Sequence, residues 1–380
     1  MDFELNEEHV AFRKVVREFT DTEIAPHAAE WDRTHEFPVD VVHKMGDLGL
    51  FGLPFSGAYG GSEADFLTLC VAIEEIARVD QSMALTLESA VGLGINPIAS
   101  FGTDAQKERW LPDLIAGRTL AGFGLTEPES GSDAAATRTR AVLDGDEWVI
   151  NGAKAFITNS GSSITSLVTV TARTGTNEIS TIIVPAGTDG FEVEPAYRKM
   201  GWHASDTHGL RFTDCRVPAD HLLGERGRGF QQFLSTLDDG RIAIAALAVG
   251  VLQGCLDASV EYAGDRLSFG KPIGSYQGVA FKISDIEVMT EAARLLTYRA
   301  AWLKDTGRPF KQAAAIAKLY ATEAAVTGTR AATQIFGGAG FMDESLVARH
   351  YRDAKVLEIG EGTSEIQRLV IARGLGLPVN

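Results

Sequence analysis

Residues 147–159 read EWVINGAKAFITN, and this stretch decides the fold, because its β-branched and aromatic residues in near-alternation are typical of a strand. Glycine-containing dipeptides such as Asp144-Gly145, Asn151-Gly152 and Asp189-Gly190 predict turns around it and after it. Three similar short stretches follow: TSLVTVT (165–171), ISTIIVP (179–185) and GLRFTDCRV (209–217). We therefore predict an antiparallel sheet or small barrel over residues 121–230.

Helical patterns flank this region on both sides. Phe12, Val15, Val16 and Phe19 recur at the spacing of an amphipathic helix. The run 66–77 is apolar and long enough for a second helix, and Thr103 with Gln106 forms a capping box that begins a third. Beyond residue 231, the Ala- and Leu-rich stretches 241–264, 282–304 and 312–336 each predict a long helix. The fold class is α+β: an all-α domain (1–120), a middle β domain (121–230) and a C-terminal helical bundle (231–380).

Composition excludes several classes of protein. Lys and Arg number 35 against 51 Asp and Glu, a net charge of −16, so a nucleic-acid partner is not expected. Cys70, Cys215 and Cys255 form no C-x-x-C pair, and no H-E-x-x-H is present, which predicts free thiols in a reducing compartment and no metal. The apolar run 242–252 is too short for the ~20 residues of a membrane span and predicts a buried helix.

The acidic opening MDFELNEEHV differs from a targeting peptide, which is basic. We expect a bacterial-type cytoplasmic protein, with a mature mitochondrial matrix protein as the alternative.

Nucleotide and hydrolase motifs are missing: no G-x-G-x-x-G joins a strand to a helix, and neither G-x-x-x-x-G-K-[ST] nor G-x-S-x-G occurs. Five other strings appear in order along the chain: LTEPESGSD (125–133), FITNSG (156–161), DRLSFGKPI (265–273), QIFGGAGF (334–341) and YRDAKVLEIGEGTSEIQR (351–368). Together they resemble the acyl-CoA dehydrogenases over essentially the whole chain.

That resemblance implies a fold and an activity. The fold is an N-terminal helical domain, a middle β domain and a C-terminal four-helix bundle, with FAD bound noncovalently at their junction. The activity is α,β-desaturation of an acyl-CoA to the trans-2-enoyl-CoA, by α-proton abstraction and β-hydride transfer to flavin N5. Electrons then pass to an electron-transferring flavoprotein. A homotetramer that serves fatty acid β-oxidation or branched-chain amino acid degradation is the family expectation.

Glu361 matches the base position of the family, in I-G-E-G-T. On local sequence alone it would more simply be a surface residue in a glycine turn, but the surrounding motif reverses that interpretation. The resemblance also implies that its backbone N–H bonds the thioester carbonyl. A few family members carry the base just before Arg241, where this chain has Gly240, so Glu361 has no competitor.

The resemblance further implies a set of FAD contacts. Leu125, Thr126 and Ser132 belong to the first flavin segment, and Phe156 and Thr158 would stack on the flavin and bond N5, although many relatives carry tryptophan at the position of Phe156. Arg266 would pair with the pyrophosphate, assisted by Ser268 and Phe269, with Gln277 nearby. Contacts from a neighbouring subunit are expected at Gln334, Gly337 and Gly338, along with Thr363 and Glu365 near the adenine end. Without the resemblance, these strings would be an ordinary loop, a strand core and a helix end.

Substrate contacts are implied for Ser132, for Asp238 and Arg241 as a helix-start pair, for the Gly362 backbone and for Arg373. A helix-end ion pair is the alternative for the charged residues among them. Gly360 stands where straight-chain enzymes commonly have tyrosine, and we hypothesise that it leaves room for a branch near the α carbon of a short acyl chain.

Two other functions fit parts of the sequence. An acyl-CoA oxidase would use oxygen to reoxidise the flavin, but oxidases of this superfamily usually carry a large additional C-terminal domain, and this chain stops soon after the motif of Glu361. A helical binding protein that had lost the chemistry would not need Glu361 or the flavin strings. The leading prediction is therefore the dehydrogenase.

Overall fold

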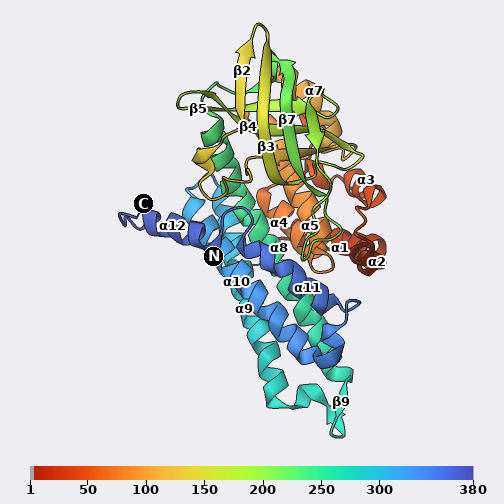
Figure 1. Ribbon diagram of the computed structural model, residues 1–380. Coiled ribbons are helices and arrows are strands. Elements are labelled where there is room, and N and C mark those ends of the chain that lie inside the picture. Colours follow the sequence, from red (N-terminus) through yellow and green to blue (C-terminus); the bar gives the residue numbers. More distant parts are fainter. Residues whose placement is uncertain (1–3, 380) are drawn as a thin grey trace.

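The computed structural model describes residues 4–379, so the first three residues of the acidic opening lie outside it. Figure 1 shows three parts: N-terminal helices, a β domain at one end and a long helical bundle that extends away from both. The N-terminal helices are α1 (Glu7–Phe19), α2 (Ala28–Thr34), α3 (Val39–Asp47), α4 (Phe66–Ala77), α5 (Gln81–Ser89), α6 (Asn96–Phe101) and α7 (Asp104–Ile115). Two short π-helices, Thr20–Ile24 and Ala90–Ile95, continue α1 and α5.

Side-chain caps set the helix starts in this domain. The Thr103 hydroxyl accepts from the Gln106 backbone N–H while the Gln106 side chain accepts from Thr103 N–H, so the predicted capping box is confirmed. Asp65 caps α4 and Asp80 caps α5, each with its side chain accepting from one backbone N–H and without a capping box. The predicted stripe of α1 was wrong at one position, because Val15 is exposed and Val16 is buried.

The middle domain is an eight-stranded sheet in the order β6-β7-β3-β2-β4-β5-β8, with β1 paired to β4. Its strands are β1 (Leu120–Gly124), β2 (Arg140–Asp144), β3 (Glu147–Thr158), β4 (Thr165–Gly175), β5 (Glu178–Pro185), β6 (Phe191–Val193), β7 (Thr207–Pro218) and β8 (Leu222–Leu223). Most pairings are antiparallel as predicted, but β1 and β2 both pair with β4 in parallel. The sheet is therefore mixed at β4, where two antiparallel groups of strands meet.

One predicted turn is wrong. Asn151-Gly152 lies within β3, where the register against β7 shifts between Ile150 and Gly152. Gly152 has φ +153°, and a Cβ there would lie 2.5 Å from the Thr139 hydroxyl oxygen, so only glycine fits without rearrangement. The dipeptide makes a β-bulge because the strand continues on both sides of it.

The C-terminal domain is built on α8 (Gly229–Asp265), α9 (Gln277–Asp305) and α10 (Lys311–Phe336), followed by α11 (Leu346–Ala354) and α12 (Ser364–Gly374). A small hairpin of β9 (Leu267–Ser268) and β10 (Lys271–Pro272) joins α8 to α9. Helix α8 begins 12 residues before the predicted start at 241. The early turns are held by the β domain, since Phe233 stacks on Phe123 of β1 and the Gln232 side chain accepts from the Thr181 hydroxyl.

Helix α8 packs against both the N-terminal helices and the other helices of the bundle. Its run 242–252 is buried as predicted. It is the one helix in residues 4–379 long and apolar enough to cross a membrane, but 83% of its most apolar window is buried inside the protein. One apolar core extends from the N-terminal helices through α8 into α9 and α10, and the sheet has a second core of its own. The cysteines Cys70, Cys215 and Cys255 are free and buried, as predicted.

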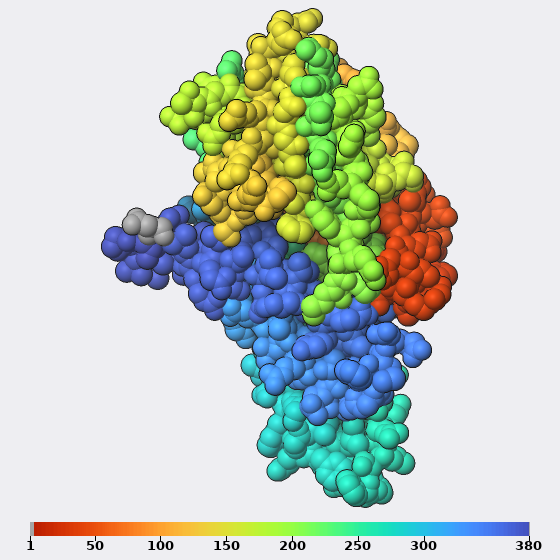
Figure 2. All heavy atoms as spheres, viewed as in Figure 1, coloured from red at the N-terminus to blue at the C-terminus, as the bar shows by residue number. Residues whose placement is uncertain are grey.

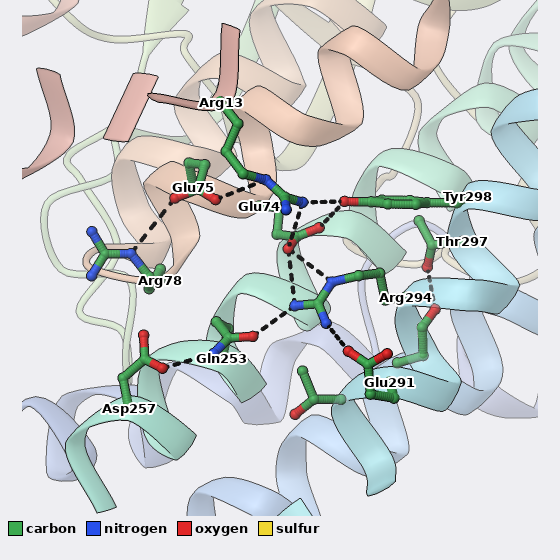
Figure 3. A network of polar contacts seen from close by, with 12 residues as sticks. Arg13, Glu74, Glu75, Arg78, Gln253, Asp257, Glu291, Arg294, Thr297 and Tyr298 are labelled. Carbon is green, nitrogen blue, oxygen red and sulfur yellow. Dashed lines mark hydrogen bonds and ion pairs between the residues drawn. The ribbon is translucent and has the colours of Figure 1, made fainter. Parts of the chain in front are cut away.

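A buried polar network joins the N-terminal helices to the bundle (Figure 3). Glu74 of α4 accepts from the Tyr298 hydroxyl at 2.7 Å and from Arg294 Nε at 3.1 Å, both on α9. Arg13 of α1 bonds the same Tyr298 oxygen at 2.6 Å and pairs with the neighbouring carboxylate, Glu75, at 3.2 Å. Since Glu74 and Glu75 are almost fully buried, the network fixes α1, α4 and α9 relative to one another.

Replacing Glu74 with alanine should lower the free energy of unfolding by about 3 kcal/mol, because Arg294 and the Tyr298 hydroxyl would lose a buried partner. Chemical denaturation followed by circular dichroism measures this. Glu291→Ala is the matched control: Glu291 pairs with the same Arg294 from an exposed position and should cost only about 0.5 kcal/mol. Equal losses in the two variants would contradict the role given to the buried carboxylate.

Candidate active site

The Glu361 carboxyl lies where α8 meets the loop between α11 and α12. Glu361 has φ +51° and Gly362 has φ +93°, so the loop turns through two left-handed residues. Such a conformation is costly for a residue with a side chain and is maintained only by its surroundings. Here the Gly362 carbonyl accepts from Lys318 Nζ and from Gln367 Nε2, each at 2.8 Å. The loop is therefore held rigidly at the residue that carries the carboxyl.

Gly240 of α8 provides the space for this carboxyl. A Cβ at Gly240 would lie 1.9 Å from Glu361 Oε2, which no real pair of atoms tolerates. The sequence predicted that Gly240 left Glu361 without a competing base. The structure adds that any side chain at 240 would displace the Glu361 carboxyl.

A second buried carboxyl, Glu88 of α5, faces Glu361. Glu88 is fully buried, and neither of its side-chain oxygens has a hydrogen-bond donor in the protein. Burial and then the charge of Glu361 raise the pKa of Glu88 well above its ordinary value. Burial also raises the pKa of Glu361, against the opposing effects of Glu88, Lys318 and Arg241. Glu88 is thus the more strongly protonated member of the pair.

A cavity of about 480 Å³ lies beside the pair, with Glu88 and Gly240 in its wall. Its lining is mixed, apolar at Val91 and Ala243 and polar towards Asn96 and Lys107. Its volume falls within the range of ~300–1,000 Å³ found for small-molecule pockets. The carboxyls therefore lie beside a space that could hold a small acyl group.

The β domain presents the predicted flavin residues with free polar groups. No hydrogen bond is formed by the hydroxyls of Thr126 or Thr158 within residues 4–379, and both residues are partly exposed. Phe156 is 66% exposed and has φ +61° at a register shift of β3. Thr158 is two residues from Phe156, and the Thr126 carbonyl accepts from Ala155 N–H at 2.9 Å, so both free hydroxyls belong to segments beside the ring. An exposed aromatic ring in a strained conformation with such hydroxyls suits the edge and face of a flavin ring.

A buried lysine holds the first flavin segment in place. Lys154 of β3 donates to the Leu125 carbonyl at 3.1 Å and pairs with Glu127 at 2.8 Å. Glu127 in turn accepts from the backbone N–H groups of Arg138 and Thr139. Burial lowers the pKa of Lys154 to about 8, although Glu127 opposes the shift. The loop that follows β1 is thereby fixed at its base, while Ser132 at its tip is exposed.

A different set of predicted cofactor residues lies at the far end of the bundle, beyond α8 (Figure 1). Arg266 follows Gly240 by 26 residues along α8, a rise of about 40 Å at ~1.5 Å per residue. Stacking of Tyr262 on Phe336, with ring centroids 4.1 Å apart, places the end of α8 beside the end of α10. The residues gathered at this end are Arg266, Ser268, Phe269, Gln277, Gln334, Gly337 and Gly338.

These distal residues are free to bind something outside the chain. Arg266 and Gln334 are exposed, and the Arg266 guanidinium makes no ion pair within residues 4–379. Phe269 is 95% exposed with φ +51°. Figure 2 shows this end of the bundle extending clear of the other domains. One chain therefore does not bring Arg266 to the flavin residues of its own β domain.

Thr363 and Glu365, which are expected near the adenine end of the cofactor, lie apart from the distal residues in this chain. The Thr363 hydroxyl accepts from Ile366 N–H and caps α12, two residues after Glu361. Glu365 is exposed in the first turn of the same helix. Both belong to the end of the molecule that carries Glu361.

The predicted substrate residues are only partly brought together. Arg241 Nη1 pairs with Asp238 Oδ1 at 2.5 Å, so the ion pair expected as the alternative is present. The pair is not at a helix start as predicted, because α8 begins at Gly229. Arg241 is buried and its Nε lacks a partner, which leaves a donor near Glu361. Arg373 is exposed at the end of α12, away from this pair in sequence and bonded to the Val379 carbonyl.

Sequence reasoning missed Glu88, Lys318 and Lys154. Each is a charged residue that is almost fully buried. A signal for Glu88 was present, since it is the one charged residue in the apolar run MALTLESAVGLGI (83–95). No group of three or more His, Cys, Asp or Glu side chains within residues 4–379 is arranged to hold a metal ion.

Comparison with known proteins agrees with this architecture. Three family models match in succession: the acyl-CoA dehydrogenase N-terminal domain at residues 6–118, the middle domain at 122–215 and the C-terminal domain at 227–376. The "Probable acyl-CoA dehydrogenase YngJ" of Bacillus subtilis is 50% identical over 99% of this chain and 100% of its own length.

Two solved structures resemble the chain closely. Butyryl-CoA dehydrogenase from Megasphaera elsdenii superimposes with a TM-score of 0.95 at 41% identity, covering 99% of this chain and all of that one. A chain from a structure reported as "Electron transferring flavoprotein of Acidaminococcus fermentans: Towards a mechanism of flavin-based electron bifurcation" gives a TM-score of 0.96 at 40% identity, covering 99% of both chains.

The fold, the buried carboxyl and the three matched domains define an oxidoreductase that dehydrogenates acyl-CoA. The chain belongs to the acyl-CoA dehydrogenase family.

Gly240→Ala should lower the turnover rate by about 100-fold, because its Cβ would displace the Glu361 carboxyl by an ångström or so. Gly264→Ala, in the same helix with open space around its Cβ, is the matched control and should leave turnover unchanged while slightly raising the melting temperature. Steady-state kinetics and thermal melts of both variants measure the effect. Full activity in Gly240→Ala would contradict the placement of the carboxyl.

Proposed function

We propose that this enzyme is an FAD-dependent dehydrogenase of short-chain or branched acyl-CoA, with Glu361 as the base that removes the α proton. The observation that carries the proposal is the Glu361 carboxyl itself: Oε2 is buried without a hydrogen-bond partner, on a strained loop and against Gly240, which lines a cavity. The likeness to a butyryl-CoA dehydrogenase supports a short acyl chain.

The residues around Glu361 suit removal of a weakly acidic proton. Burial raises the pKa of Glu361, which makes its carboxylate a stronger base than an exposed glutamate. The backbone N–H of Glu361 has no acceptor within residues 4–379. It is therefore available to bond the thioester carbonyl and to stabilise the negative charge that develops there.

The free groups of the β domain fit FAD. The hydroxyls of Thr126 and Thr158 would bond the flavin edge, and Phe156 would cover part of its face. When bound, FAD would accept the β hydrogen as hydride. The side chains of this protein hold the substrate in place and take the α proton.

The rest of FAD would be held by a second copy of the chain. Arg266 is unpaired and about 40 Å along α8 from Gly240, beyond the reach of a flavin bound near Glu361 in the same chain. A neighbouring copy could present Arg266 and Gln334 to the pyrophosphate and adenine. The exposed rings of Phe269 and Phe341 at the same end support burial against another copy. We therefore propose that FAD sites are shared between subunits, and the homotetramer is proposed on the expectation from the family.

An electron-transferring flavoprotein is the proposed electron acceptor. The close likeness to a chain from a structure of that name supports it.

A bacterial-type cytoplasmic location is proposed on the bacterial relative and the three free cysteines. Roles in fatty acid β-oxidation and branched-chain amino acid degradation follow from the proposed substrate class.

Glu361→Gln should retain FAD and bind acyl-CoA, yet lose at least 100-fold in the rate of flavin reduction, because an amide cannot take the proton. Anaerobic mixing with butyryl-CoA, followed by flavin absorbance, measures this. Unchanged bleaching would refute Glu361 as the base.

Slow reoxidation of the reduced wild-type enzyme in air favours a dehydrogenase, and fast reoxidation would favour an oxidase.

Gly360 should favour branched short-chain substrates. A Cβ at Gly360 would meet only the Val356 carbonyl at 3.5 Å, so the space beside Glu361 is open. We expect isobutyryl- or 2-methylbutyryl-CoA to be turned over faster than octanoyl-CoA, with butyryl-CoA as the straight-chain reference. Gly360→Ala should lower the ratio of branched to straight turnover, while Gly264→Ala should not. A clear preference of the wild type for octanoyl-CoA would contradict the hypothesis.

A further inference from the structure

We propose that Glu88 and Glu361 share one proton, which resides on Glu88, so that neutral Glu88 donates a hydrogen bond to the Glu361 carboxylate and keeps it ready to act. This inference rests on the proposed function, in which Glu361 is the base. Glu88 acts through Glu361 and is a positioning residue.

The isolation of Glu88 is the first argument. The other almost fully buried carboxylates of residues 4–379 each accept a hydrogen bond or an ion pair from a named donor, as Glu74 does from Tyr298 and Asp353 from Trp202 N–H. The remaining ones are Asp32, Glu75, Asp80, Glu127 and Asp206. Glu88 has no such donor, and both of its oxygens are buried. A buried carboxylate without a donor is strongly unfavourable, so Glu88 must be neutral.

The facing carboxyl is the second argument. Two ionised carboxylates can only accept hydrogen bonds, and neither the Glu88 oxygens nor Glu361 Oε2 has a donor as they stand. One proton between them turns the contact into a charge-assisted hydrogen bond and satisfies an oxygen on each side. The pair then carries a single negative charge in a space that could not stabilise two.

The charges around the pair favour this assignment. Burial raises the pKa of both carboxyls, but Glu88, Lys318 and Arg241 oppose the shift at Glu361, whereas the charge of Glu361 adds to the shift at Glu88. The proton therefore belongs to Glu88 and the charge to Glu361. The other titratable groups on the cavity wall are Tyr59, Lys107, Asp239, Lys304 and Asp305. Of these, Lys304 and Asp239 already pair with each other at 2.8 Å.

The catalytic step balances with the pair in this state. The Cα–H bond of the acyl-CoA would break and its proton would form an O–H bond on Glu361, while bound FAD would supply the two-electron acceptor for the β hydrogen. The pair changes from a charge of −1 to neutral, and Glu88 keeps its own proton throughout. Glu88 and Glu361 are therefore never both ionised.

The pH dependence of flavin reduction tests the pair with two variants. Glu88→Gln keeps a donor for Glu361 but cannot titrate. Glu88→Leu removes the donor, and the loss of a hydrogen bond to the charged form should move the acid limb of the rate profile to higher pH by about one to two units. We expect Glu88→Gln to keep the acid limb near that of the wild type. The variant should also lose the ionisation of Glu88 itself, which the wild type would show at alkaline pH. Glu358→Gln, which removes a carboxyl paired with Lys355 three residues before Glu361, is the matched control and should leave the profile unchanged.

Infrared difference spectroscopy provides a readout that needs no turnover. At neutral pH, wild type minus Glu88→Gln should show the carbonyl stretch of a protonated carboxyl, and wild type minus Glu358→Gln should not. Absence of that band, or superimposable rate profiles for the wild type and Glu88→Leu, would overturn the shared proton.

Failure of the inference is distinguishable from failure of the proposed function. If Glu361→Gln remains active, the assignment of the base is wrong and the shared proton loses its catalytic role. If Glu361→Gln is inactive while the Glu88 variants behave as the wild type, the base stands and only the shared proton is wrong.

Discussion

The ionic contacts around Glu74 and Glu75 determine how the active site is assembled. Two adjacent carboxylates of α4 are buried between α1, α8 and α9, and arginines from α1 and α9 converge on them (Figure 3). Buried charges of this kind are stable only when every partner is present. They therefore allow a single docking position of α4 against the bundle. Helix α5 begins four residues after α4 ends and carries Glu88 towards α8. The position of α4 against the bundle therefore also determines how far Glu88 lies from Glu361.

Much of the fold could be predicted from local sequence, because the patterns involved are local. The capping box at Thr103, the strands around residues 147–185 and the long helix through 242–252 each depend on residues a few positions apart. The errors arose where tertiary contacts override the local pattern. Asn151-Gly152 has turn chemistry, but β7 on one side keeps it in a strand. The early start of α8 is a different kind of error, because Phe230, Phe233, Leu234 and Leu237 do recur at helical spacing and were overlooked. Contacts with Phe123 and Thr181 of the β domain hold these turns in place.

The site could be predicted only where one motif contains the chemistry. Glu361 was assigned because the string around it, YRDAKVLEIGEGTSEIQR (351–368), resembles a motif of the family, whereas its local sequence alone favoured a surface residue in a glycine turn. Its positive φ shows that the backbone there is strained. Glu88 and Lys318 reach Glu361 from segments far away in the chain, and no local pattern records such a meeting. Arg266 was assigned to the cofactor through a motif, but its distance from the β domain became visible only with the full length of α8.

Within the described residues, three of the eight non-glycine residues with positive φ are predicted ligand contacts. Phe156, Phe269 and Glu361 all have positive φ without being glycine, and all three were predicted from sequence to contact the cofactor or substrate. A glycine at any of them would relieve the strain, but it would remove the ring or the carboxyl that the site requires. The strain must therefore be offset by surrounding contacts, and at Glu361 these are the bonds from Lys318 and Gln367 to the Gly362 carbonyl. Burying Lys318 for this purpose lowers its pKa to about 8, so the lysine stays charged at neutral pH and stabilises the loop and the ionised form of Glu361 together. The residue that holds the loop thus also sets the charge of the base, and this leaves Glu88 as the carboxyl that keeps the proton.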